Sequence, residues 1–408
     1  MRRHLENPIS AVLAAFLLSS ACGRTPLDDI RPGQSDGASQ NRSDGDGDDR
    51  GPQSSGPGMS AVAGSMLLAR FGHTATLLPN GQVLIAGGSG ASDGLSSVSA
   101  LARAELYDPK SGSFRETGTM VVARTAHTAT LLLTGKVLIV GGMGGSDLPS
   151  RAEIYDPDSG QFTATGTMTA QRYEHKATLL PNGQVLITGG FSQKENYQIP
   201  PQAELYDPAS GQSTTTGAML HACADHTATL LRNGRVLITG GRNSIYYSRA
   251  ELYDPAGGAF GDTGKMAYER WDHTATVLPS GKVLVTGGWG IGSGRIYNFL
   301  SSAETYDPGS GTFTEVGAMN TGRGGHTETL LPSGKVLVIG GWGGELNDEV
   351  LSSTELYDPD SGSFAVTGSM AVARVAHTAT LLPNGKVLIV GGRGRDSTEP
   401  FSSSELYY

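Results

Sequence analysis

From about residue 57 onward, the chain repeats one pattern of apolar and polar positions. In the last copy, residues 377–382 are a run of β-forming residues, residues 383–385 (Pro-Asn-Gly) signal a tight turn, and residues 386–390 form an apolar strand that ends at a Gly pair. A loop of variable length follows, then a short strand with the Glu-Leu-Tyr-Asp-Pro pattern, as at residues 355–359, and a last strand, as at residues 363–366. The pattern predicts four antiparallel strands per unit and no helix.

The unit occurs seven times, at a step of roughly 50 residues. Every copy carries a Met and, seven positions later, a His; the pairs are Met66/His73, Met120/His127, Met168/His175, Met219/His226, Met266/His273, Met319/His326 and Met370/His377. Because one unit cannot bury its apolar face alone, the units must stack on one another in a closed array. The fold predicted for residues 57–408 is therefore an all-β, seven-bladed β-propeller.

The ends of the repeat region predict how the array closes. The chain stops at residues 405–408, which match the third strand of a unit, so the seventh unit lacks a fourth strand. Residues 58–66 align with the fourth strand and its flanks at residues 362–370. We therefore expect this N-terminal strand to complete the last blade, which removes the sheet edges that an open array would expose.

Three repeated features resemble Kelch repeats: Arg-x-x-His at the start of a unit, Gly-Gly after the second strand and Tyr after the third. The resemblance runs from about residue 57 to the end and implies a propeller that is usually a binding platform. One branch of that family, similar to galactose oxidase, is a copper-radical enzyme that needs a Cys cross-linked to a Tyr, a second Tyr and two His. Cys223 is the sole thiol available for such a site, and no Tyr-His dipeptide occurs in the chain. We therefore expect no catalytic residues and no cofactor.

The first 22 residues are typical of an export signal. The apolar run at residues 11–18 is too short to span a bilayer and ends in Ser19-Ser20-Ala21-Cys22. The small residues before Cys22 resemble a bacterial lipobox, with Ser19 where Leu is usual, which implies lipidation of Cys22. Gly23 after the Cys implies the outer membrane or the cell surface as the location. The alternative is an ordinary signal peptide, cleaved nearby, and a secreted protein.

Composition separates a linker from the repeats and excludes one class of partner. Residues 23–56 are mostly Gly, Ser, Asp, Pro, Gln and Arg, with almost no large apolar side chain, so we expect a disordered tether. The net charge is −9, the isoelectric point is near 5.5 and the repeats contain no Lys/Arg cluster, which argues against a nucleic-acid partner. We expect a monomer that contacts a membrane through the N-terminal lipid alone.

Unit four departs from the repeat in its polar residues. Where six units have Arg three positions before the repeat His, unit four has Cys223, and His221 and Asp225 lie close to it. Together with His226, these residues place three potential metal ligands at alternate positions and a fourth beside them. They are the candidate metal ligands; the alternative is a drifted repeat in which a small buried Cys replaced the Arg. The Arg, His and Glu that recur across the units are expected instead to form buried polar pairs that serve the fold.

The loops on one face of the predicted propeller vary, whereas the turns on the other face are short and nearly constant. The variable face comprises the loops that enter the first strand and those that join the second strand to the third. In three successive units an acidic residue stands just before the repeat His, at Glu174, Asp225 and Asp272. Aromatic residues are concentrated on the same face; the candidate ligand contacts among them are Phe191, Tyr246, Tyr247, Trp271, Trp289, Tyr297 and Trp342.

Aromatic rings beside carboxylates are typical of a site for carbohydrate or for a cationic peptide, because ring faces stack on sugars or cations while carboxylates accept their hydrogen bonds. We therefore predict an exported binding or scaffold module that recognises a cell-envelope protein or a glycan through the variable-loop face. Two alternatives stay open. The loops could pack only on one another, or a metal-dependent enzyme could use the ligands at residues 221–226.

Overall fold

The described residues form antiparallel sheets of four strands each. The computed structural model describes residues 58–91, 98–144, 151–192, 198–291, 297–344, 349–395 and 399–408. Within these ranges there is no helix, and seven four-stranded sheets contain most of the strands. The predicted all-β class and the four antiparallel strands per unit are thereby confirmed. The predicted signal peptide, its Cys22 and the predicted linker lie outside the described residues.

We number the sheets 1 to 7 by the order of their first strands along the chain. The first strands are β2 (Thr74–Leu77), β8 (Thr128–Leu131), β12 (Lys176–Leu179), β16 (Thr227–Leu230), β21 (Thr274–Val277), β28 (Thr327–Leu330) and β34 (Thr378–Leu381). The second strands are β3 (Val83–Ala86), β9 (Val137–Val140), β13 (Val185–Thr188), β17 (Val236–Thr239), β22 (Val283–Thr286), β29 (Val336–Ile339) and β35 (Val387–Val390). The third strands are β6 (Arg103–Asp108), β10 (Arg151–Asp156), β14 (Gln202–Asp207), β18 (Arg249–Asp254), β25 (Ala303–Asp307), β32 (Ser353–Asp358) and β36 (Ser403–Tyr407). The fourth strands are β7 (Ser113–Thr119), β11 (Gln161–Thr167), β15 (Gln212–Ala218), β19 (Ala259–Lys265), β26 (Thr312–Glu315), β33 (Ser363–Ser369) and β1 (Ser60–Ser65).

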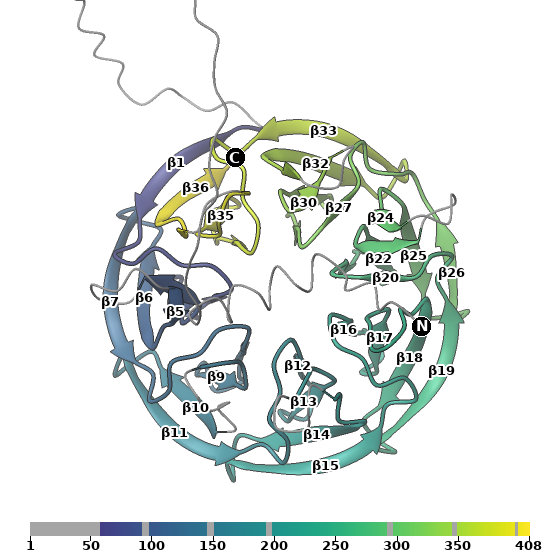
Figure 1. Cartoon of the computed structure of the whole chain (residues 1–408), viewed down its shortest axis with the longest axis horizontal. Coiled ribbons are helices and arrows are strands. Elements are labelled where there is room, and N and C mark those ends of the chain that lie inside the picture. The colour runs from purple at the N-terminus through teal and green to yellow at the C-terminus, as the bar shows by residue number, and fades with distance from the viewer. Residues whose placement is uncertain are drawn as a thin grey trace, which may run out of the picture. The chain divides into compact units, whose positions relative to one another are not determined.

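The first strands surround a common axis, and the fourth strands lie on the outer rim (Figure 1). Each first strand contacts the first strand of the next sheet, and β34 of sheet 7 contacts β2 of sheet 1. Sheet 7 contains strands from both ends of the repeat region. Strand β1 pairs antiparallel with β36, with Ser60 opposite Tyr407 and Val62 opposite Glu405. The backbone N–H of Gly58 also donates to the carbonyl of Tyr408 at 2.8 Å, so the two ends lie side by side.

The apolar core lies between neighbouring sheets. The second strand Val83–Ala86 is buried at every position, because it is covered on both faces, and this explains its unbroken apolar run. One core cluster joins Leu84 and Leu106 of sheet 1 to Ile139 and Tyr155 of sheet 2. Each sheet therefore buries its apolar surface against the next sheet, as the repeat pattern requires.

Six buried Arg–Glu ion pairs hold the segments that enter each first strand against the third strand of the same sheet. With N–O distances of 2.6–3.1 Å, the pairs are Arg70–Glu105, Arg124–Glu153, Arg172–Glu204, Arg270–Glu304, Arg323–Glu355 and Arg374–Glu405. Glu105, for example, also accepts hydrogen bonds from the backbone N–H groups of Leu67 and Leu68, at 2.8 and 3.1 Å. The expectation that the recurring Arg and Glu form buried polar pairs is confirmed for these six sheets.

The seven repeat His residues are also buried and polar-bonded. In each of them Nε2 shares a hydrogen bond with a Thr hydroxyl, as His127 does with Thr74 at 3.1 Å. Burial, reinforced by the positive charge of Arg124, lowers the pKa of His127 to about 3. The ring is therefore neutral at physiological pH, which suits a structural hydrogen bond within the core.

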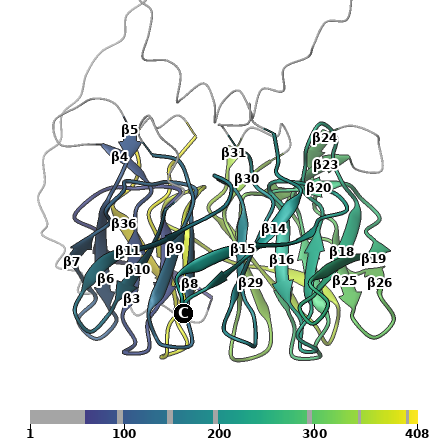
Figure 2. The same cartoon turned by 90° about the horizontal axis from the view of Figure 1, so that it is seen from below.

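Short extra strands lie on one face of the sheets, and Figure 2 shows most of them from the side. They are β4 (Ser89–Ala91), β5 (Val98–Ala100), β20 (Arg270–Trp271), β23 (Trp289–Ile291), β24 (Tyr297–Phe299), β27 (Arg323–Gly324), β30 (Trp342–Gly343) and β31 (Glu349–Val350). All belong to loops that enter a first strand or join a second strand to a third. This is the variable-loop face, and the opposite face carries the short Pro-Asn-Gly and Asp-Pro turns.

Candidate functional site

The residue before each repeat His has a left-handed backbone. Its φ lies between 52° and 60° in all seven sheets, at Gly72, Ala126, Glu174, Asp225, Asp272, Gly325 and Ala376, which we call the axial ring. The backbone N–H of five of these residues donates to the carbonyl of the equivalent residue in the preceding sheet, as Gly325 does to Asp272 at 3.0 Å. A left-handed backbone favours Gly, yet five of the seven residues are not Gly, and three of these five are acidic.

Two of these acidic side chains contact Arg242, which follows the Gly pair after β17. The Arg242 Nε donates to Asp225 Oδ2 at 2.6 Å, and Arg242 Nη2 lies 3.9 Å from Glu174 Oε2. These three side chains are 8–20% exposed. Asp272, by contrast, is exposed, and its carboxylate makes no hydrogen bond or ion pair with another part of the described chain.

Aromatic rings surround the Arg242 guanidinium. Its Cζ lies 5.0 Å from the ring centroid of Phe191 and 4.6 Å from that of Trp271. Tyr246 stacks on Trp271 with the centroids 6.3 Å apart, and Tyr297 meets Tyr246 edge-on at 5.2 Å. We call the whole group the Arg242 cluster: Glu174, Phe191, Asp225, Arg242, Tyr246, Trp271, Asp272 and Tyr297.

Burial and mutual repulsion shift the acidity of the cluster. Desolvation, and then the negative charge of Asp225, raises the pKa of Glu174 well above its ordinary value. Asp272 is open to solvent, but the surrounding protein still partly desolvates it; this effect and the charge of Asp225 raise its pKa to about 7. Burial opposes the charge on Arg242, but the nearby carboxylates outweigh that effect and raise its pKa. One guanidinium is therefore set among three carboxyl groups, and at neutral pH some of these are protonated.

Three other residues selected from the sequence lie outside this cluster. Trp289 packs edge-on against Phe299 at 4.7 Å, and its backbone pairs with that of Trp271. Trp342 is half-buried in β30, where it pairs with Gly324. Tyr247 packs into the core cluster of sheet 4 that contains Cys223.

The four candidate metal ligands of unit four each have a different environment and do not converge on one point. Cys223 is 2% exposed, and burial raises the pKa of its thiol well above the ordinary value. His226 Nε2 hydrogen-bonds to Thr188 at 2.9 Å, whereas Asp225 is bound to Arg242. His221 Nε2 lies 3.8 Å from Asp262. Within the described ranges, no group of three or more His, Cys, Asp or Glu side chains could hold a metal ion.

Because sheet 4 has Cys223 in place of the Arg, its third-strand Glu251 has a different set of contacts. Glu251 accepts hydrogen bonds from the backbone N–H groups of Leu220 and His221, at 2.8 and 2.7 Å. Desolvation raises its pKa. The side chain that a guanidinium neutralises in six sheets is thus held here by backbone amides alone, as far as the described residues show.

Arg242 is the one member of the cluster that sequence reasoning missed. It occupies the position after the Gly pair, where the equivalent residues in other sheets include Phe191, Trp289 and Trp342. The backbone bridges of this position to the residue two before the repeat His, such as Arg242 to Ala224, confirm the equivalence. The equivalent residues in sheets 1, 2 and 7 are Ser89, Met143 and Arg393, so a cation at this position did not by itself distinguish sheet 4.

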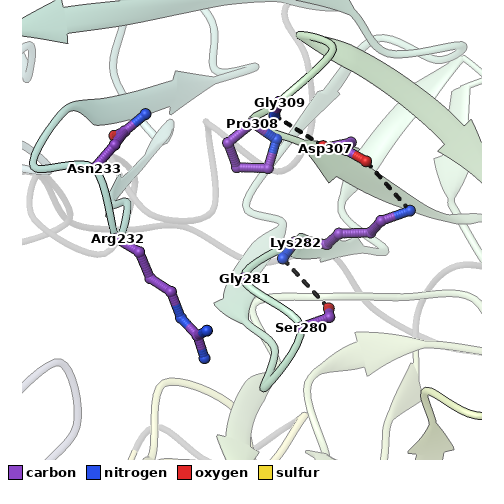
Figure 3. A pocket seen from close by; sticks show the side chains of 8 residues that line it. All are labelled: Arg232, Asn233, Ser280, Gly281, Lys282, Asp307, Pro308 and Gly309. Atoms are coloured by element: carbon purple, nitrogen blue, oxygen red, sulfur yellow. Dashed lines mark hydrogen bonds and ion pairs between the residues drawn. The ribbon is translucent and has the colours of Figure 1, made fainter.

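Two surface pockets occur away from the cluster, on the face of the short turns. One, of about 320 Å³, is lined by Arg232, Asn233, Ser280, Gly281, Lys282, Asp307, Pro308 and Gly309 (Figure 3). In it the ammonium of Lys282 lies 3.5 Å from Asp307, and Arg232 donates to the carbonyl of Pro279 at 2.6 Å. The second, of about 630 Å³, lies between sheets 2 and 3. Neither pocket includes a residue selected from the sequence.

No helix long and apolar enough to cross a membrane is present in the described part of the chain.

Comparison with known proteins agrees with this architecture. A family model of the Kelch motif matches residues 124–169. No curated protein matches the chain. Among solved structures, a fungal alcohol oxidase of the AA5 family in complex with copper is similar, with a TM-score of 0.66 and 19% sequence identity over 85% of this chain and 76% of that chain. At this identity the likeness concerns the fold. The described part of the chain is thus a β-propeller fold that carries a Kelch motif.

Proposed function

We propose that this chain is an exported binding or scaffold module that recognises a cell-envelope protein or a glycan through the variable-loop face. The Arg242 cluster is the observation that carries this proposal. Its carboxylates come from three neighbouring sheets, and its rings from loops of the same face. Asp272 is exposed and Tyr297 is 45% exposed, so the cluster presents polar and aromatic groups to solvent as well as packing on itself.

We also propose the finer architecture that such a module needs. The seven sheets are the blades of one closed propeller over residues 57–408, and β1 completes the last blade. The pairing of β1 with β36 and the contact between β34 and β2 support closure. Residues 1–22 are a signal peptide with a lipidated Cys22, and residues 23–56 tether a monomeric propeller to the outer membrane or cell surface. A secreted form results if Cys22 is not lipidated.

Cross-linking capture from a cell-envelope extract tests the proposed face. The bait is the purified full-length protein, compared with a variant that carries Tyr246→Ala, Tyr297→Ala and Trp342→Ala. We expect the variant to capture roughly tenfold less protein or glycan, because aromatic anchors carry much of the energy of such contacts.

The matched control is Tyr408→Ala, an aromatic residue beside Lys386 on the short-turn face, which should capture as much as the wild type. Equal capture by the triple variant and the wild type refutes the proposed face. Stoichiometric copper or zinc in the purified protein, lost on Cys223→Ala, would instead favour the metal-dependent enzyme.

A further inference from the structure

We propose that the exposed carboxylate of Asp272, next to Trp271 in the Arg242 cluster, binds the cationic end of a Lys or Arg side chain from a partner protein. This inference rests on the proposed binding function and names the chemistry that the face selects. The ligand group is an alkylammonium or a guanidinium. Its subsite lies where the axial ring passes from Asp272 to the small residue Gly325.

The first argument is the unmet hydrogen-bonding capacity at this position. Asp225 is bound to Arg242, but the carboxylate of Asp272 is open and has no partner in the described ranges. Trp271, directly before it, is only 3% exposed, and its indole N–H has no hydrogen-bond partner. Two consecutive residues thus carry a buried donor without a partner and an exposed carboxylate that is open to a ligand.

The second argument is the balance of charge. Glu174, Asp225 and Asp272 act on one another as like charges, and Arg242 is the cation that contacts two of them. Asp272 makes no contact with a cation of the described chain, but the charges of Arg242 and, more weakly, of Lys176 from the first strand of sheet 3 act on it and oppose the rise of its pKa. The neighbouring His175, His226 and His273 are buried with lowered pKa values, so they add no positive charge at neutral pH. A further cation would favour the charged form of these carboxyl groups, which desolvation and then mutual repulsion now oppose.

The third argument selects the class of cation. The described residues offer no group of three ligands for a metal ion. They do offer aromatic rings, and Arg242 already demonstrates that a guanidinium fits between Phe191 and Trp271 with a carboxylate at 2.6 Å. Tyr246 and Tyr297 extend the aromatic wall toward solvent. Rings beside a carboxylate favour an organic cation over a neutral sugar, because both the ring faces and the carboxylate attract positive charge.

The test is calorimetric titration of the purified full-length protein at low salt. The probes are the capped tripeptides Ala-Arg-Ala and Ala-Lys-Ala, with Ala-Gln-Ala as the neutral control and spermidine as a cation without a peptide backbone. We expect the two cationic peptides to bind more tightly than the neutral one. Their affinity should rise about tenfold from pH 6 to pH 8, because Asp272, with a pKa of about 7, loses its proton in that range.

Asp272→Asn is the decisive variant, since Asn tolerates the left-handed backbone and keeps the shape of the side chain. It should weaken binding of the cationic peptides about tenfold and remove the pH dependence, whereas the control Asp262→Asn should change neither. Circular dichroism verifies that both variants are folded. Equal affinity for the cationic and neutral peptides, or full affinity in folded Asp272→Asn, overturns the inference. So does tighter binding of spermidine than of either peptide, because the partner would then not be a protein. If partner capture still depends on the aromatic residues of the face, the proposed function survives that failure.

Discussion

At the scale of single residues, the axial ring retains side chains that oppose stability. A non-Gly residue with a left-handed backbone costs roughly 1–2 kcal/mol. Glu174, Asp225 and Asp272 are in this conformation, as are Ala126 and Ala376, whereas Gly72 and Gly325 avoid the cost. The three acidic side chains repel one another. The backbone cost is shared with the two Ala, so the charge repulsion in three adjacent sheets is what distinguishes the acidic positions.

The titration of Asp272 makes this cost measurable. Its pKa in the folded protein is about 7, above the ordinary value of 3.8, so the folded protein holds a proton that the unfolded chain releases. The stability that it contributes is fully present below about pH 4 and is lost as the pH rises through about 7. The buried repeat His, whose pKa values are lowered, act in the opposite direction in both proteins. We therefore expect the melting temperature of Asp272→Asn, relative to that of the wild type, to rise from pH 5 to pH 8. Identical pH profiles for the wild type, Asp272→Asn and the control Asp262→Asn would contradict this assignment.

The residue scale is also where sequence reasoning failed. It selected Glu174, Asp225 and Asp272 because these positions repeat, and a departure from a repeat can be recognised by comparing units. Arg242 lies in a loop whose length differs between units, so no comparison singled it out. Its contacts with Glu174, Phe191 and Trp271 join residues that are distant in the sequence, and only the assembled sheets bring them together.

At the scale of elements, a buried Arg–Glu ion pair stabilises six of the seven sheets, and sheet 4 lacks the Arg of this pair. In sheet 7, Arg374 binds Glu405 at 2.7 Å and lies 5.5 Å from the ring of Phe401. Sheet 4 has Cys223, Glu251 and Tyr247 at the equivalent positions. The comparison explains why Cys223 is buried among apolar neighbours, and it favours the interpretation of a drifted repeat for this residue.

Restoring the Arg–Glu ion pair in sheet 4 should stabilise the protein. The double variant Cys223→Arg/Tyr247→Phe copies the arrangement of sheet 7 and gives Glu251 a cationic partner. We expect urea denaturation to report a gain of about 1–3 kcal/mol, the usual contribution of hydrogen bonds to charged groups. Adding Glu251→Gln should abolish most of the gain. A loss of stability in the double variant would contradict this prediction and would show that the core around Cys223 no longer accommodates an Arg side chain.

At the scale of the whole molecule, one hydrogen bond is missing at the seam between the chain ends. In five sheets a Thr of the fourth strand bonds the Tyr hydroxyl of the next sheet, as Thr117 does with Tyr155 at 2.8 Å, whereas sheet 5 has Val316 at this position. At the seam, strand β1 carries Ala63 at the equivalent position, and the hydroxyl of Tyr107 is buried without a partner. The contact between sheets 7 and 1 therefore lacks a hydrogen bond that five other sheet contacts have.

Ala63→Thr should supply the missing partner if β1 completes the last blade. We expect a gain of roughly 1 kcal/mol, observed as a higher melting temperature, from one added buried hydrogen bond. The same substitution in a Tyr107→Phe background should give no gain, because the acceptor is absent. An equal gain in both backgrounds would show that the Thr acts through its strand propensity, and it would contradict the proposed hydrogen bond to the Tyr107 hydroxyl.

Prediction from sequence succeeded best for features that the repeat itself determines. The strand order, the turns and the buried Arg–Glu pairs follow from local periodicity that recurs in every unit. The aromatic loops were harder, because their packing depends on neighbours from other sheets. Trp289 and Tyr247 were selected as ligand contacts, yet one packs against Phe299 and the other into the core of sheet 4.

The bond between Gly58 and Tyr408 has a consequence for how the chain could be reconnected. These residues meet at 2.8 Å, so a short flexible linker could join them without moving either strand. New termini could then be opened in a short turn, such as the one between Asp254 and Gly258, whose hydrogen bond spans only 2.8 Å. Such a circular permutant should keep every strand pairing of the described residues and move the chain break from sheet 7 to sheet 4. The point at which the chain starts is, in this sense, independent of the order of the sheets around the axis.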